Sequence, residues 1–339
     1  MIRDLYIENF RGFDKLKIDN IKKINFLVGK NNCGKTSVLE SISLMISILN
    51  INTGYYINGI RRIKENPEEL KNLFHNLNYE NTIKLNYTLD TDDNYNLNIS
   101  PIMKKDNSFF NDIVSLEYNF SIFHKNDKEK QNFKYSLENI NEIENKILRY
   151  NHNIKGVYIS TYIDYKDLVN YLIEILKNKK EKQLLEMVSF FNKNIEAINI
   201  LKNDIYFNIN GISELVLLNL MGDGLKKYLS IILPIAANRY NNILVDEIEN
   251  GLHHKTIKHL LKSILDLSKN NDIQMFFTTH SYEVLKFLSE IVNNDEFYDI
   301  KDTVNVINIV NTENKGFQSY NYDMDNVKEL LENDSDIRY

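Results

Sequence analysis

The sequence predicts an α/β fold in which layered sheets pack against helices, interrupted by a mixed, mainly helical insertion. Apolar strand patterns alternate with helical patterns through the last third of the chain, which is typical of an α/β core. Near the start, the apolar run Ile24–Val28 leads through a glycine-containing turn into a helical pattern. Hydrophobic residues make up 43% of the 339 residues, enough for a sizeable core.

The N-terminal part alternates apolar and polar residues, as half-buried strands do. We expect strands around Ile2–Ile7 and Leu16–Ile18, then the buried strand Ile24–Val28 and a helix from Lys35 to about Leu49 that is buried on most faces. Further short strands are expected at Ile83–Leu89, Val114–Phe123 and Asn132–Tyr135.

The middle of the chain, from about Leu137 to Lys202, has a mainly helical pattern. A strand is expected at Gly156–Ser160, and helices at Tyr165–Asn178 and Lys182–Leu201. The elements expected after it are strands Ile205–Ile209 and Glu214–Asn219, helix Gly224–Asn238, strand Asn242–Asp246, helix His254–Lys269, strand Ile273–Thr278, helix Tyr282–Asn293 and strand Thr303–Val310. We therefore divide the chain into 1–136 and 204–339, which form the core, and the insertion 137–203.

Composition excludes several classes of protein. The single cysteine, Cys33, cannot form an internal disulfide, which fits a reducing compartment. No apolar h-region follows Met1, and the longest apolar stretch, Leu229–Ala237, is too short to span a bilayer. We expect a cytoplasmic protein without a membrane partner. The net charge of −6 argues against a dedicated nucleic-acid coat, although a local basic patch could still bind nucleic acid.

The segment GKNNCGKT matches the phosphate-binding pattern G-x-x-x-x-G-K-[ST] between a strand and a helix. Backbone N–H groups of such a loop bind the phosphates of a nucleotide, Lys35 reaches the β- and γ-phosphates, and the Thr36 hydroxyl binds Mg²⁺. ATP and Mg²⁺ are thus the expected ligands. The residues expected to bind the nucleotide are Gly29, Lys30, Asn31, Asn32, Cys33, Gly34, Lys35, Thr36 and Ser37.

An apolar strand ends in two acids at Asp246 and Glu247. A carboxylate at the end of a strand beside the phosphate loop can hold magnesium, the role expected of Asp246. Glu247 would then polarise the attacking water as general base. On its own, such a strand could simply be followed by solvated acids, but phosphoryl transfer needs both this segment and the loop.

At these residues the chain resembles a known family. The run DEIENGLH at Asp246–His253 closely resembles the Walker B and D-loop run of ABC-type ATPases in the OLD/RecF/SMC branch. Phe276–Ser281 resembles their switch segment, Asn9–Phe13 their N-terminal motif, and Leu220–Leu225 their divergent signature. The motifs occur in family order and frame nearly the whole chain outside the insertion.

The resemblance implies roles for further residues. His280 would lie near the γ-phosphate and contribute to catalysis with Glu247 and Lys35, and Arg11 would contact phosphate. Gly222, Asp223 and Gly224 would bind ATP held by another subunit, which implies a homodimer or a higher homo-oligomer. Each of these assignments has an alternative without a functional role. His280 could be a packed or capping histidine, Arg11 an arginine at the edge of the core, and Gly222–Gly224 a turn before a helix.

OLD nucleases carry an added Toprim domain with an Asp-x-Asp pair. Here Asp323-x-Asp325 is followed by only 14 residues, so we expect it to begin a short helix instead. The chain then resembles ATPase subunits of antiphage systems such as PARIS, Septu and retron modules. This resemblance implies a sensor, scaffold or motor subunit with a separate effector protein, a nuclease. The alternatives are a RecF- or SMC-like DNA clamp, a transporter subunit and a scaffold that holds ATP without hydrolysing it.

Overall fold

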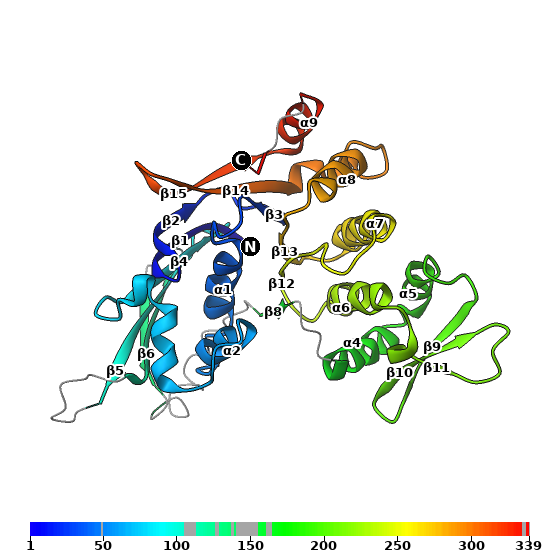
Figure 1. Cartoon of the computed structure of the whole chain (residues 1–339), viewed down its shortest axis with the longest axis horizontal. Coiled ribbons are helices and arrows are strands. Elements are labelled where there is room, and N and C mark those ends of the chain that lie inside the picture. Colours follow the sequence, from blue (N-terminus) through cyan, green and yellow to red (C-terminus); the bar gives the residue numbers. More distant parts are fainter. Residues whose placement is uncertain are drawn as a thin grey trace.

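The fold is described from a computed structural model of the chain. The structure describes residues 1–48, 50–104, 113–125, 129–136, 139, 155–160, 165–333 and 337–338. Within these residues the strands form two six-stranded sheets and one three-stranded sheet. Figure 1 shows the central sheet between a row of helices on one side and, on the other, a helix backed by the second large sheet. This layered arrangement confirms the predicted α/β class.

The central sheet has the strand order β15-β14-β3-β13-β12-β8. Its strands are β3 (Ile24–Val28), β8 (Gly156–Ile159), β12 (Asn242–Val245), β13 (Gln274–Thr278), β14 (Val304–Thr312) and β15 (Gly316–Tyr322). All neighbours pair in parallel except β14 and β15. Every residue of β3, β12 and β13 is buried, as expected for parallel strands covered on both faces. Their carboxyl ends therefore meet at one edge of the sheet.

Helices cover both faces of the central sheet. Helices α6 (Asp223–Ala237), α7 (His254–Asn270) and α8 (Tyr282–Val292) line one face, and α1 (Lys35–Ile46) lies on the other (Figure 1). Nearly every residue of α1 is buried, because the second large sheet covers the side that faces away from the central sheet. The predictions for these four helices are confirmed apart from their end residues.

The second large sheet, here called the β-lobe, is antiparallel with the order β2-β1-β4-β5-β6-β7. Its strands are β1 (Ile2–Phe10), β2 (Phe13–Ile18), β4 (Ile83–Leu89), β5 (Asn94–Met103), β6 (Ile113–His124) and β7 (Glu129–Tyr135). The connecting elements are α2 (Thr53–Ile60) and the 3-10 helices η1 (Pro67–Leu73) and η2 (His75–Leu77). The predicted strands are confirmed, and β5, within an asparagine-rich stretch, is an addition.

The helix predicted over Lys182–Leu201 is wrong in its second half. The structure has α5 (Glu181–Val188) and then β9 (Ile195–Leu201), which pairs antiparallel with β10 (Asp204–Ile209). The segment Ile195–Leu201 is rich in isoleucine, which favours strands. Pairing with β10 supplies the hydrogen bonds between strands that stabilise it as β9. The preceding helix α4 (Tyr165–Lys177) is confirmed and packs against α6.

The predicted insertion 137–203 is described only in part. Residues 137, 138, 140–154 and 161–164 lie outside the described residues, so the helical prediction from Leu137 is not tested there. The strand predicted at Gly156–Ser160 is confirmed as β8, and it pairs with β12 in the central sheet. The domain boundaries themselves stay predictions.

The remaining elements are short. The strand predicted at Glu214–Asn219 is reduced to β11 (Val216–Leu217), which is followed by the 3-10 helix η3 (Leu218–Leu220). A further 3-10 helix, η4 (Tyr298–Thr303), precedes β14. The helix predicted after Asp323 is confirmed as α9 (Met324–Glu332), and the Asp323 side chain caps it. Among the described residues, no helix combines the length and apolarity that crossing a membrane requires.

A buried amide joins the central sheet to the β-lobe. Gln274 in β13 accepts a hydrogen bond from the Ile2 N–H at 2.8 Å. Its amide nitrogen donates to the carbonyl oxygens of Ile2 at 2.7 Å and Lys22 at 2.9 Å. The side chain is 1% exposed. It therefore satisfies three backbone groups at the point where the two sheets meet.

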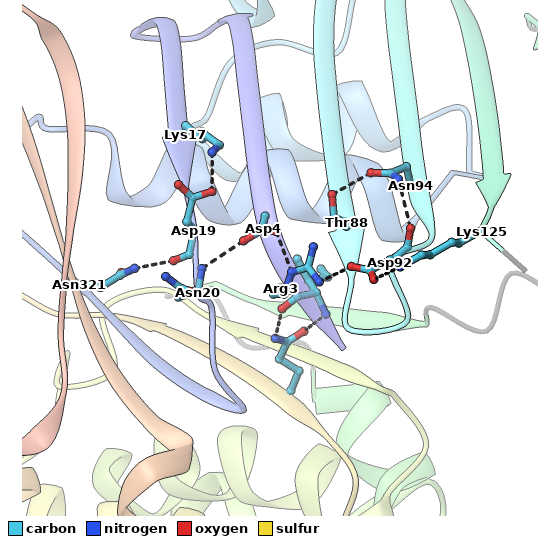
Figure 2. Close-up of polar contacts among 12 residues, drawn as sticks. Arg3, Asp4, Lys17, Asp19, Asn20, Thr88, Asp92, Asn94, Lys125 and Asn321 are labelled. Carbon is cyan, nitrogen blue, oxygen red and sulfur yellow. Dashed lines mark hydrogen bonds and ion pairs between the residues drawn. The ribbon is translucent and has the colours of Figure 1, made fainter.

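Surface polar contacts surround this junction (Figure 2). Arg3 contacts Asp4 at 2.8 Å and also Asp92, in the turn between β4 and β5. Lys125 contacts the same Asp92 at 2.6 Å. The side chains of these ion pairs are partly exposed to solvent, so each pair contributes little to stability. The buried amide of Gln274 is the stronger link.

We predict that Gln274→Leu lowers the free energy of unfolding by about 2–3 kcal/mol, because the backbone groups of Ile2 lose their partners inside the protein. Urea denaturation measures the change. The control is Gln183→Leu, because the Gln183 amide makes only a 3.4 Å surface contact with Asp266. Its unfolding should stay within about 0.5 kcal/mol of the wild type. Equal destabilisation by both variants would contradict this account of the junction.

Candidate functional site

The phosphate loop connects β3 to α1 and requires glycine at two positions. Gly29 has φ +136°, and a Cβ there would lie 2.4 Å from the Ile309 carbonyl oxygen. Gly34 has φ +92°, and a Cβ there would lie 2.3 Å from the Phe13 ring. Gly34 also caps α1 without a side-chain hydrogen bond, which leaves the first N–H groups of the helix for an anion. The cradle fits a nucleotide phosphate.

The Lys35 ammonium lies inside this loop. It donates to the carbonyl oxygens of Gly29 at 2.8 Å and Lys30 at 2.9 Å, and it is 3.7 Å from the Cys33 sulfur. The residue is 4% exposed, and burial lowers the pKa of its ammonium. Lys30, Asn31 and Asn32 are exposed, whereas Cys33 and Ser37 are buried. A bound phosphate would give the buried charge a partner of opposite sign.

Asp246 lies directly after β12 and joins the loop to the neighbouring strand. Its carboxylate accepts hydrogen bonds from the Thr36 hydroxyl at 3.0 and 3.2 Å, and from the Thr278 hydroxyl at 2.6 Å. These are the hard oxygen ligands that Mg²⁺ prefers. In the described part of the chain, no three His, Cys, Asp or Glu residues gather as metal ligands. A magnesium ion at Thr36 and Asp246 would therefore draw its other ligands from phosphate and water.

Glu247 follows Asp246 in a left-handed backbone conformation, with φ +49°. Its N–H donates to the Thr278 hydroxyl at 2.7 Å, and its carboxylate accepts from the Asn250 amide at 3.1 Å. A left-handed conformation is strained for a residue other than glycine, and such strain is common at functional sites. The Glu247 side chain is half-buried. Thr278 lies within the predicted switch segment Phe276–Ser281, but no separate role was predicted for its hydroxyl from the sequence.

His280 follows β13 at the same edge of the sheet. Its N–H donates to a Glu249 carboxylate oxygen at 2.7 Å, and its carbonyl oxygen accepts from Arg338 at 2.5 Å. Burial and the charge of Lys35 both lower the pKa of the imidazole, and the acids of the site oppose them. The lowered pKa favours the neutral form of the ring. The structure brings Lys35, His280 and the Asp246–Glu249 run to one edge.

The signature residues open α6. Gly222 is the cap of the helix and makes no side-chain cap hydrogen bond. Among the described residues, a Cβ on Gly222 would meet no atom within 4 Å, and one on Gly224 would reach only Phe191 at 4.0 Å. Asp223 is exposed and pairs with Lys226 at 2.9 Å. Packing within the described part of the chain therefore gives no reason for glycine at these two positions.

Arg11 has partners other than those expected of a phosphate contact. Its guanidinium donates to the Glu40 carboxylate and to the Asn72 carbonyl oxygen, both at 2.9 Å. Arg61 donates to the same carboxylate at 2.6 Å and to the Ser37 hydroxyl at 3.1 Å. The Glu40 side chain is fully buried and that of Arg11 is 6% exposed. The structure thus supports the alternative of a core-edge arginine.

Glu40 and Arg61 were not predicted from the sequence, although an acid among the apolar residues of the α1 pattern was a signal for a buried ion pair. Burial lowers the pKa of the Arg11 guanidinium despite the charge of Glu40. For Arg61, burial is again the largest effect and lowers the pKa, but the hydrogen bond to Glu40 and the charges of Glu40 and other nearby acidic groups together outweigh it and raise the pKa. The cluster ties the β1–β2 turn, α1 and the end of α2 together beside the phosphate loop.

Lys227 in α6 was also missed. It is 5% exposed, and within the described residues its ammonium has no hydrogen-bond partner. Burial lowers its pKa, while the charges of Asp246, Glu247 and Glu249 act in the opposite direction. A buried cation without a direct partner is costly to keep, and the acids of the site compensate for part of that cost. The sequence shows two adjacent lysines here and does not reveal which one is buried.

The fold and this edge together define the class of protein: an ABC-type P-loop ATPase fold of the SMC/RecF kind. An SMC head bound to the C-winged-helix domain of ScpA is similar over 96% of this chain and 98% of that one, with a TM-score of 0.53 at 13% identity. An SMC head with an extended coiled coil, derived from Pyrococcus furiosus, gives a TM-score of 0.50 at 11% identity over 98% of both chains. These likenesses confirm the predicted fold.

Residues 24–286 match the family described as "AAA domain, putative AbiEii toxin, Type IV TA system". The match spans well over half of the chain, and the chain belongs to this family. The "ATP/GTP phosphatase" of Helicobacter pylori is 28% identical over 336 residues, covering 88% of this chain and 90% of that protein. The DNA replication and repair protein RecF of Francisella tularensis is 26% identical over 231 residues, covering 58% and 61%.

We predict that Glu40→Gln lowers the free energy of unfolding by about 3 kcal/mol, because the buried Arg11 guanidinium loses its opposite charge. Chemical denaturation followed by circular dichroism measures the loss. Glu80→Gln is the matched control, since Glu80 is exposed in the loop before β4, and its effect should stay within about 0.5 kcal/mol. An unfolding midpoint for Glu40→Gln equal to that of the wild type would show that the cluster does not stabilise the fold.

Proposed function

We propose that this protein binds and hydrolyses ATP with magnesium at the edge formed by the phosphate loop, Asp246 and Glu247. The observation that carries the proposal is the hydrogen bonding of Thr36 to Asp246, at 3.0 and 3.2 Å, beside a glycine cradle that admits no Cβ. Membership of an AAA-domain family and the similarity to an "ATP/GTP phosphatase" support it. GTP is therefore a second nucleotide to test.

Each residue has a role in this proposal. The loop N–H groups and Lys35 bind the phosphates, while Thr36 and Asp246 hold the metal ion. Magnesium held there would supply positive charge that neutralises the phosphates. Glu247 accepts a proton from the attacking water, and the Asn250 amide at 3.1 Å helps to orient its carboxylate. His280 contributes a hydrogen bond near the transferred group.

We further propose that two copies of the chain bind ATP between them. In the part of the chain that the structure describes, Gly222 and Gly224 have no packing partner that demands glycine, and the neighbouring Leu220 is 77% exposed. An uncovered helix N-terminus with two glycines suits the phosphates of a nucleotide held by Lys35 of the other copy. ATP would then shift the population toward the closed dimer by its differential affinity for that state.

The proposed cellular role is that of a cytoplasmic sensor, scaffold or motor subunit of an antiphage defence complex with a separate effector, a nuclease. The family description refers to a "putative AbiEii toxin" of a toxin–antitoxin system, and this supports a role in a defence complex. The alternative role is a DNA-repair clamp that acts on DNA directly. The similarity to RecF over 231 residues favours this alternative.

We predict that Glu247→Gln binds ATP with unchanged affinity and hydrolyses it at least about 100-fold more slowly, because the general base is lost. Phosphate release and binding of a fluorescent ATP analogue measure the two effects. The control is Glu313→Gln, at an exposed position after β14, which should hydrolyse ATP like the wild type. Hydrolysis by Glu247→Gln at the wild-type rate would reject Glu247 as the base.

Lys35→Ala should lose nucleotide binding itself, because its ammonium is the cation that reaches into the phosphate loop. A tenfold or larger increase in the dissociation constant, about 1.4 kcal/mol, is expected. Unchanged affinity in this variant would reject the loop as the nucleotide site.

Purification of tagged Glu247→Gln from the native host, in ATP and magnesium, tests the cellular role, with Lys35→Ala as the control bait. Mass spectrometry then identifies the bound material. A stoichiometric nuclease or other toxic effector, present with Glu247→Gln only, would support the defence complex. Recovery of a homodimer with DNA and no protein partner would reject it in favour of the clamp.

A further inference from the structure

The backbone of His280 is held on both sides by charged side chains from distant parts of the chain. Its N–H donates to Glu249, in the segment after β12, at 2.7 Å. Its carbonyl oxygen accepts from the Arg338 guanidinium at 2.5 Å. Hydrogen bonds to charged groups are stronger than those between neutral groups. The position of this histidine is thus restrained by two separate segments.

Arg338 is itself fixed in place. The neighbouring Ile337 is 4% exposed and belongs to the hydrophobic core between the central sheet and α6–α8. The Ile337 carbonyl oxygen accepts from the Asn308 amide of β14 at 2.6 Å. The Arg338 guanidinium also lies 5.8 Å from the centre of the Tyr282 ring, in the first turn of α8. The buried Ile337 therefore anchors the Arg338 guanidinium next to the switch segment.

The same anchor reaches the phosphate loop. Asn308 is 3% exposed, and its amide oxygen would lie 3.1 Å from a Cβ placed on Gly29. Ile309, the next residue in β14, lies against Gly29 through its carbonyl oxygen, at 2.4 Å from the same point. Asn308 thus contacts the start of the phosphate loop and holds the segment that carries Arg338. Asn308 therefore contacts both the phosphate loop and the segment that holds the switch residue His280.

We infer that Arg338 is a positioning residue for ATP hydrolysis, which acts by holding the His280 backbone at the edge of the nucleotide site. The inference rests on the proposed function and extends it to a residue outside every motif of the sequence. Release of the His280 carbonyl would leave the ring free to move away from the transferred group, and small displacements of a catalytic group have large effects on rate. Nucleotide binding at the phosphate loop does not require this contact.

Steady-state kinetics of a double-mutant cycle tests this role. Arg338→Ala should lower kcat by about 5- to 30-fold, the effect of one charge-assisted hydrogen bond, with KM for ATP changed less than about twofold. Arg338→Lys, which keeps a charged donor, should recover part of the loss. In a His280→Ala background, Arg338→Ala should have little further effect, because the two residues act through one step. If Arg338→Ala lowered kcat in the His280→Ala background by the same factor as in the wild type, the inference would be overturned.

Hydrogen exchange followed by mass spectrometry gives a readout that does not depend on activity. Arg338→Ala should raise the exchange rate of the amides in the segment from Thr279 to Tyr282 about tenfold, by releasing a local restraint. Arg239→Ala, at an exposed site after α6, should change neither this rate nor kcat. Unchanged exchange in Arg338→Ala would overturn the inference. A wild-type protein that hydrolyses no nucleotide would instead reject the proposed function, and the exchange rates would still decide whether Arg338 restrains His280.

Discussion

The Asp246 carboxylate is the interaction on which the rest of the site depends. It accepts hydrogen bonds from Thr36 at the start of α1 and from Thr278 at the end of β13. This contact exists because β12, β13 and β3 are parallel neighbours, so their carboxyl ends meet at one edge. One buried side chain therefore aligns the phosphate loop, the acidic run and the switch segment. Such alignment is what phosphoryl transfer requires of a protein.

The shape of the phosphate loop depends on both sheets. Phe13 of the β-lobe lies against Gly34, and the carbonyl oxygen of Ile309, from β14 of the central sheet, lies against Gly29. Helix α1 is buried between the sheets, and the charged cluster around Glu40 ties it to the β-lobe. The phosphate loop is thus held by groups from both sheets.

The elements predicted from sequence are those with local patterns. The phosphate loop, the buried strands and the amphipathic helices are encoded within short windows, and the structure agrees with them. The parts that were missed depend on contacts distant in sequence. The segment Ile195–Leu201 is a strand because β10 pairs with it, Arg11 is buried because Glu40 lies opposite, and Arg338 reaches His280 across 58 residues of sequence. No periodicity reveals such partners.

The claim that Thr36 and Asp246 form a magnesium-nucleotide site is tested most directly by calorimetric titration of a non-hydrolysable ATP analogue. The titration is run with and without magnesium, on the wild type and on Asp246→Asn. Magnesium should tighten binding to the wild type by about tenfold or more, or about 1.4 kcal/mol. In Asp246→Asn, the amide oxygen can still accept from Thr36 and Thr278. This variant should keep the affinity measured without magnesium and lose the tightening that magnesium gives the wild type. An equal gain in both proteins would contradict the account.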